Sequence, residues 1–134
     1  MDKVNILLLV IAYIAMFNCI VRSDYNVVIA ITSYFYWSSR HTKTQRVAYI
    51  IIIILAAATV FDVIWLVLIW KSWTGKEWAS PVWNRLRFWH ITVIFFTILN
   101  MLVKLVAIFF IRQQEQRSGN ADFQRERKPL IQNA

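Results

Sequence analysis

The chain has 134 residues, a length that suits one domain. Hydrophobic residues make up 59% of it and charged residues 16%, against about 45–50% and about 25% in soluble globular proteins. This composition excludes a soluble globule and a disordered chain, and the single cysteine excludes an internal disulfide. The net charge of +8 is gathered in short clusters between apolar runs, which is the pattern of a membrane protein.

Four apolar runs follow one another, and a helix of about 20 such residues crosses the hydrocarbon of a bilayer. The first run, Val4–Val21, carries no charge, and the sequence around Met16 offers no small-residue cleavage site, which favours a retained span over a signal peptide. The second run, Tyr25–Trp37, is short. The expected spans cover about residues 4–22, 25–39, 47–71 and 88–112. The sequence therefore predicts an all-α integral membrane protein, a four-helix transmembrane bundle over residues 1–112 with a cytosolic C-terminal tail over 113–134.

The distribution of lysine and arginine sets the expected orientation. With four spans, one side carries nine of these residues: Lys3, Arg40, Lys43, Arg46, Arg112, Arg117, Arg125, Arg127 and Lys128. The other side carries five: Arg22, Lys71, Lys76, Arg85 and Arg87. Both termini are therefore expected in the cytosol.

Five tryptophans crowd into the connection between the third and fourth runs and its borders: Trp70, Trp73, Trp78, Trp83 and Trp89. Because indole rings prefer the headgroup region, this connection is expected to lie on the non-cytosolic face as an interfacial anchor. A binding surface for a partner or a lipid is the alternative.

Asp62 and Lys104 are the formal charges inside the expected spans. A charge near the middle of a bilayer costs at least about 2.5–3.5 kcal/mol, so each is expected to face protein or water. A pair between the third and fourth helices satisfies both. Counting from the loop that they share, however, places the two Cα atoms roughly 10 Å apart in depth, and Lys104 could instead extend its stem to the cytosolic headgroups.

Further polar residues share helix faces with these charges. On the fourth helix His90, Thr97 and Asn100 fall on the face of Lys104, and on the third helix Thr59 lies beside Asp62. Such a seam stabilises a bundle, contacts a partner, or carries protons or ions; packing is the favoured interpretation. The sequence holds no phosphate-binding loop, metal-ligand spacing or nucleophile elbow, so neither an enzyme nor a cofactor is expected.

The C-terminal tail is polar, and Gly119 is expected to end the fourth helix. Glu126 stands four residues before the pair Leu130 and Ile131, which is the spacing of an acidic dileucine sorting signal. Pro129 is expected to hold this segment extended. The tail is therefore a candidate address for endosomal and lysosomal membranes, and the alternative is a solvated basic segment that touches anionic lipid.

The order of several motifs resembles the type-1 angiotensin II receptor-associated protein family. The matching pieces are Val4-Asn5, Cys19-Ile20-Val21 with Ser23 and Tyr25, Trp37, Ala58-Thr59-Val60-Phe61-Asp62-Val63-Ile64 and Leu102-Val103-Lys104-Leu105. The resemblance covers roughly residues 4–112 and does not extend to the tail. It implies a small multi-span protein of Golgi, endosomal and related membranes that acts as an adaptor for a receptor.

The leading functional hypothesis is a non-enzymatic accessory or adaptor protein that binds a larger membrane protein or complex. That partner is a receptor in traffic or an organellar complex such as a proton pump, and nucleic acid is not expected as one. The alternative is a small ion or proton transporter that uses Asp62 and the polar seam of the fourth helix.

Overall fold

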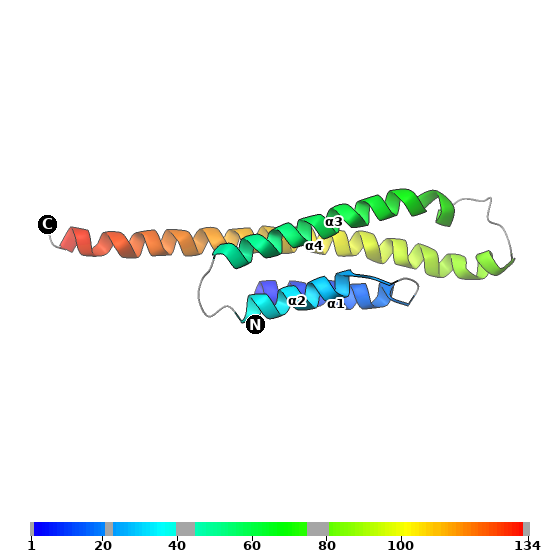
Figure 1. Ribbon diagram of the computed structural model, residues 1–134, viewed down its shortest axis with the longest axis horizontal. Helices are drawn as coiled ribbons and strands as arrows, with labels where there is room; N and C mark the ends of the chain where they lie inside the picture. Colours follow the sequence, from blue (N-terminus) through cyan, green and yellow to red (C-terminus); the bar gives the residue numbers. More distant parts are fainter. Residues whose placement is uncertain (1, 21–22, 40–44, 75–80, 133–134) are drawn as a thin grey trace.

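The computed structural model describes residues 2–20, 23–39, 45–74 and 81–132, with side chains within 2–20, 23–39, 46–70 and 87–117. Four helices occupy these ranges: α1 (Lys3–Asn18), α2 (Asn26–Ser38), α3 (Gln45–Thr74) and α4 (Pro81–Gln132). The predicted all-helical fold is confirmed for this part of the chain. The two long helices α3 and α4 pack against each other, and the short α1–α2 hairpin lies along part of their length (Figure 1).

Each helix buries residues at alternating spacings of three and four, the heptad pattern of left-handed helix bundles. The buried positions with this spacing are Val4, Leu8, Ile11, Ala15 and Asn18 in α1, and Asn26, Ala30, Ser33 and Trp37 in α2. In α3 they are Ala48, Ile51, Leu55, Ala58 and Asp62, and in α4 they are His90, Val93, Thr97, Asn100, Lys104, Ala107 and Ile111. Ala12, Ile14 and Ile94 are buried beside these positions. The core is therefore a seam that is apolar at one end and polar where α1 turns into α2.

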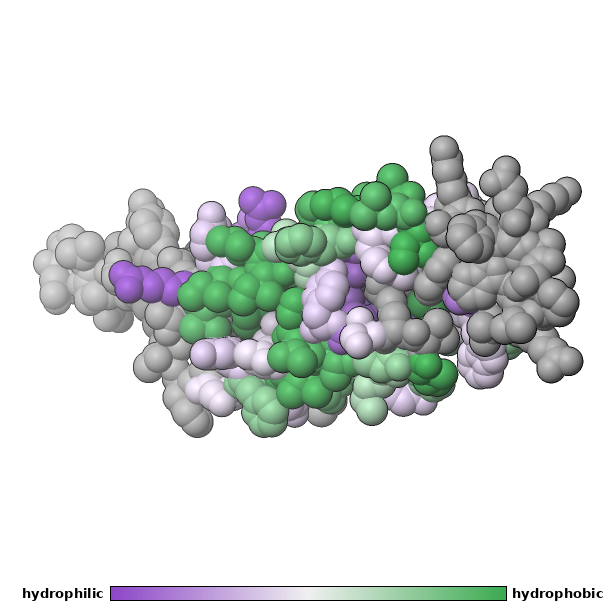
Figure 2. Space-filling view, turned by 45° about the vertical axis from the view of Figure 1, so that its right-hand side comes forward, coloured by the Kyte–Doolittle hydropathy of each residue, from purple (hydrophilic) through white to green (hydrophobic). Residues whose placement is uncertain are grey.

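Two of the described helices are long and apolar enough to cross a membrane, over Arg46–Trp70 and Arg87–Arg117. Only 22% and 33% of the residues in their most apolar windows are buried inside the protein, whereas the core helix of a soluble protein is mostly buried. Large side chains such as Val67, Leu68 and Phe88 point outward with about 70% of their surface exposed. Apolar residues cover much of the visible middle of the molecule (Figure 2).

The hairpin is shorter than the two long helices. With a rise of about 1.5 Å per residue, the 16 residues of α1 extend about 24 Å, less than the roughly 30 Å of bilayer hydrocarbon. The predicted first span of residues 4–22 is too long at its C-terminal end, because α1 ends at Asn18 and Cys19 caps it with an N–H bond back to Ala15. Past this point the chain turns back, which brings Asp24 and Asn26 onto the same seam.

The prediction for the tail was wrong in its backbone, since α4 continues through Gly119 and Pro129 to Gln132. Glutamine, glutamate, arginine and lysine dominate residues 113–128 and are good helix formers, so they outweigh the cost of about 1 kcal/mol for one glycine. The helix also begins earlier than predicted, at Pro81, a residue whose fixed φ suits a first helical position. The part of α4 beyond Arg112 extends past the other helices (Figure 1).

Candidate functional site

A buried ion pair joins α3 to α4. The Lys104 Nζ lies 2.5 Å from the Asp62 Oδ2, and neither side chain has any exposed surface. Burying either charge alone would cost several kcal/mol of free energy, but the ammonium and the carboxylate neutralise each other through a direct hydrogen bond. The pairing left open by the sequence is therefore present.

The α2 helix completes the surroundings of this pair. The Oδ1 of Asn26 accepts a hydrogen bond from Lys104 Nζ at 2.6 Å. The Nδ2 of Asn26 donates to Asp62 Oδ1 at 3.1 Å. Tyr25 donates its hydroxyl to the same Asp62 oxygen at 3.0 Å, and lies 3.2 Å from the Ala58 carbonyl. Both carboxylate oxygens of Asp62 thus accept hydrogen bonds, as the burial of an ionised group requires.

A second group of polar residues lies where α1 turns into α2. Asn18 donates from Nδ2 to Asp24 Oδ2 at 3.0 Å and to Thr97 Oγ1 at 3.4 Å. The other oxygen of Asp24 accepts from the backbone N–H of Asn26 at 2.9 Å, which caps the start of α2. Asn26 belongs to both groups, because its side chain bonds to the ion pair and its backbone N–H bonds to Asp24. Together the two groups form one polar region that links all four helices.

The remaining residues of the predicted seam have different environments. Thr97 and His90 are buried on the α4 seam, and Thr97 also donates to the Val93 carbonyl. Thr59 is half-buried and donates to the Leu55 carbonyl within its own helix. Asn100 is fully buried, and neither atom of its amide has a partner among the described residues.

The depth argument against the pair fails for a geometric reason. The α4 helix begins farther out than the point where α3 ends (Figure 1), so equal counts from the loop do not correspond to equal depths. The long stem of Lys104 then covers the remaining separation while its ammonium stays inside the bundle. Lys104 therefore does not extend to the headgroups.

Sequence reasoning missed the contribution of the first two helices. The predicted seam does not include Asn18, Asp24, Tyr25 or Asn26, yet all four form hydrogen bonds within the polar region. A signal was available, because Asn18 continues the seam spacing of α1 and Asn26 begins that of α2. A polar residue on an otherwise apolar seam indicates a buried hydrogen bond.

The predicted interfacial tryptophans lie only in part within the described side chains. Trp70 and Trp89 lie at the ends of the two candidate spans, with 51% and 44% of their surface exposed. Trp78 lies outside the described residues, and the side chains of Trp73 and Trp83 are outside them too. The same holds for the side chains of the sorting motif, Glu126, Leu130 and Ile131.

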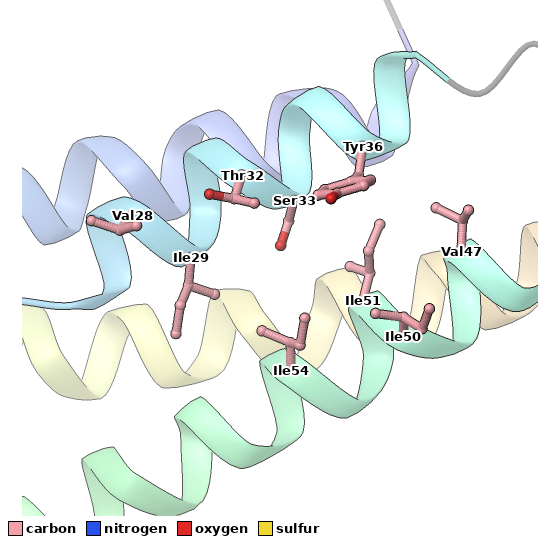
Figure 3. A pocket seen from close by; sticks show the side chains of 9 residues that line it. All are labelled: Val28, Ile29, Thr32, Ser33, Tyr36, Val47, Ile50, Ile51 and Ile54. Carbon is pink, nitrogen blue, oxygen red and sulfur yellow. The ribbon is translucent and has the colours of Figure 1, made fainter.

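A groove separates α2 from α3 on the outer surface of the bundle. It has a volume of about 360 Å³ and is lined by both helices (Figure 3). From α2 come Val28, Ile29, Thr32, Ser33 and Tyr36, and from α3 come Val47, Ile50, Ile51 and Ile54. The groove therefore lies along the α2–α3 contact, and neither Asp62 nor Lys104 lines it.

The charged side chains of the polar region all have partners of some kind. Asp62 and Lys104 form an ion pair, and the carboxylates of Asp62 and Asp24 accept hydrogen bonds. No group of three or more His, Cys, Asp or Glu able to hold a metal occurs among the described residues. Comparison with family models, curated proteins and solved structures gives no match to this chain.

Proposed function

We propose that this chain is a non-enzymatic accessory protein of a larger membrane protein or complex, inserted as a four-span bundle with both termini in the cytosol. The observation that carries the proposal is the closed network around Asp62 and Lys104. It shows buried charges used to hold helices together inside an apolar bundle, while the outer surface presents hydrocarbon side chains to its surroundings.

Several features support the membrane topology. The α3 and α4 helices have the length and apolar surface of spans, and the hairpin packs on α4 by a continuous seam. The Asp24 carboxylate in the turn of the hairpin is paired internally, since it accepts from Asn18 and from the backbone of Asn26. A turn with paired polar groups can lie close to hydrocarbon at low cost.

The arrangement of the chain ends supports a common side for both termini. Asp2 accepts a hydrogen bond from Gln114 of α4, so the start of α1 lies at the end of the bundle from which α4 continues. That end carries the larger number of basic residues, which supports its placement in the cytosol. The projecting part of α4, residues 113–132, is then available to a cytosolic partner.

The resemblance to the angiotensin receptor-associated family supports a receptor in traffic as the partner, and an endomembrane location in Golgi, endosome, lysosome or vacuole. The outward-facing apolar side chains suit equally a subunit docked on a multisubunit organellar complex such as a proton pump. The seam residues Asp62 and Lys104 are not the partner's contact site in this proposal, because they are buried within the chain.

Site-specific photocrosslinking in cells tests the proposal. A photoreactive residue is placed, one at a time, at the outward-facing positions Val28, Phe61, Val67, Phe95 and Phe109. A docked subunit gives crosslinks to one protein from adjacent positions and none from the opposite face. The buried position Leu55 is the matched control. Absence of protein crosslinks from every position, with purification of the chain as a single species in mild detergent, would contradict the proposal.

The transporter alternative is separated by flux measurements. A transporter needs an ionisable group that exchanges with water, whereas Asp62 is fully buried against Lys104. Proteoliposomes of the purified chain are therefore expected to show no proton or cation flux above empty vesicles. A flux that disappears in Asp62→Asn would favour transport over the accessory role.

A further inference from the structure

A polar cavity opens between the start of α1 and the end of the candidate span in α4. It has a volume of about 510 Å³ and lies far along the bundle from the buried ion pair. Its lining combines apolar, amide and charged side chains: Asp2, Lys3, Val4, Phe110, Gln113, Gln114 and Arg117. No part of the proposed function uses it.

The charges of this cavity favour an anion. Lys3 and Arg117 bring two cations, both with exposed side chains, and Gln113 and Gln114 add amide groups that can donate hydrogen bonds. Asp2 is the carboxylate in the lining, and its Oδ2 accepts from Trp37 Nε1 at 3.0 Å and from Gln114 Nε2 at 3.1 Å. The carboxylate is thus occupied by donors of its own, and the cations outnumber it.

The position of the cavity matches the boundary of a bilayer. It begins at Phe110, the last aromatic residue of the apolar part of α4, and ends at Arg117 in the polar part. The Lys3 ammonium lies 5.7 Å from the centre of the Phe110 ring, so a cation and an apolar surface adjoin each other. Basic pockets on the cytosolic side of spans bind acidic lipid head groups in this way.

We propose that this cavity binds the phosphate group of an acidic membrane phospholipid. Lys3 and Arg117 contact the phosphate, the two glutamine amides donate to its oxygens, and the acyl chains run along the half-buried Phe110 ring. The inference rests on the proposed membrane insertion of the bundle. The ligand class follows from two cations and two amides above an apolar floor.

Native mass spectrometry of the full-length protein in detergent tests the site. The probes are dioleoyl phosphatidic acid and dioleoyl phosphatidylcholine, which share acyl chains and differ in head group. Phosphatidic acid is expected to give the larger fraction of lipid-bound protein. Each removed cation should weaken its binding about fivefold, and Lys3→Gln with Arg117→Gln about 30-fold.

Two control variants and one competition experiment test whether the binding is specific to this cavity. The pair Lys43→Gln with Arg46→Gln removes the same charge from the same expected side and should leave binding unchanged. Lys3→Arg with Arg117→Lys keeps the charge and should retain binding even where the glutamine pair loses helix content by circular dichroism. Equal binding of both lipids, an equal loss in the Lys43 and Arg46 pair, or displacement by glycerol 3-phosphate at the concentration of the lipid would each overturn the site.

Resistance of the protein to extraction from membranes by alkaline carbonate separates this proposal from the proposed function. Extraction would contradict membrane insertion, and the lipid site with it. Retention in the membrane together with no preference for phosphatidic acid would overturn the lipid site alone.

Discussion

Lys104 and Asp62 form a fully buried ion pair across 42 positions of sequence, with 2.5 Å between Nζ and Oδ2. Asn26 bridges the two by accepting from the lysine and donating to the carboxylate. A bridged pair of this kind fixes the register of three helices, because a shift of any of them by one residue would separate its members. Each prediction on the interior of the bundle follows from this geometry.

Removal of one member of the pair should destabilise the bundle strongly. Lys104→Met leaves the buried Asp62 carboxyl group with no countercharge, a loss typically of about 3–5 kcal/mol. Chemical unfolding in detergent micelles, followed by helical circular dichroism, measures the free energy of unfolding. Leu105→Met on the exposed side of the same turn is the control and should change stability by less than about 0.5 kcal/mol.

Removal of both charges should restore most of that loss. Asp62→Leu combined with Lys104→Met replaces the pair by apolar groups, which is often neutral in a buried setting. The double variant is therefore expected to be more stable than either single variant in the same unfolding measurement. A double variant as unstable as the sum of the two single variants would contradict the coupling of Asp62 and Lys104.

Two buried asparagines on this seam should respond in opposite ways to the same change. Asn26→Leu removes hydrogen bonds from both charges and should cost about 1–3 kcal/mol. In Asn100→Leu an amide without a partner among the described residues is replaced by an apolar group, so the free energy of unfolding should be unchanged or higher. A loss in Asn100→Leu equal to that in Asn26→Leu would show that the Asn100 amide has a bound partner, such as an internal water.

The sequence was sufficient to predict four helices, although not their bounds, and to place four polar residues on one face of α4. Long apolar runs leave no alternative to a helix in hydrocarbon, and the spacing of His90, Thr97, Asn100 and Lys104 places them on one face whatever the helix packs against. All four side chains are buried in the structure. Periodicity thus predicts which side of a helix is inside.

The contacts that those residues make could not be predicted from the sequence. Which atom meets Lys104 depends on the axial offset between α3 and α4, and that offset is not determined by the length of the loop. The end of α1 at Asn18 was not predicted, because the apolar run continues through Cys19, Ile20 and Val21 with no composition change. The hairpin turn is determined by the buried bonds of Asp24 and Asn18, which are tertiary contacts.

The distribution of basic residues predicts a membrane topology that epitope tags can test. A short epitope tag at either terminus should be accessible to antibody after selective permeabilisation of the plasma membrane, and a tag within residues 75–80 should not be. The reason is the excess of lysine and arginine at the end that holds Asp2 and residues 112–117. Accessibility of one terminus only would show an odd number of spans and contradict the four-span proposal.

The last prediction concerns the sorting motif. Changing Leu130 and Ile131 together to alanine should move the protein from endosomal or lysosomal membranes to the cell surface, measured by surface biotinylation. Adaptor recognition needs the two aliphatic side chains on an extended segment, whereas residues 125–132 are helical in the structure. The energy needed to unwind this last turn is small, because Pro129 lacks an N–H and cannot donate to the preceding turn, and helix ends open most readily.

The matched control changes Gln132 and Asn133 to alanine, which alters the same end of the tail outside the motif and should leave the surface fraction unchanged. If the change at Leu130 and Ile131 leaves the location as it was, the helix persists in the cell and the motif is a chance match. The location of the protein would then depend on the spans or on the partner that they bind. A shift to the surface only in the Leu130 and Ile131 variant would instead show that the end of α4 unwinds when it is recognised.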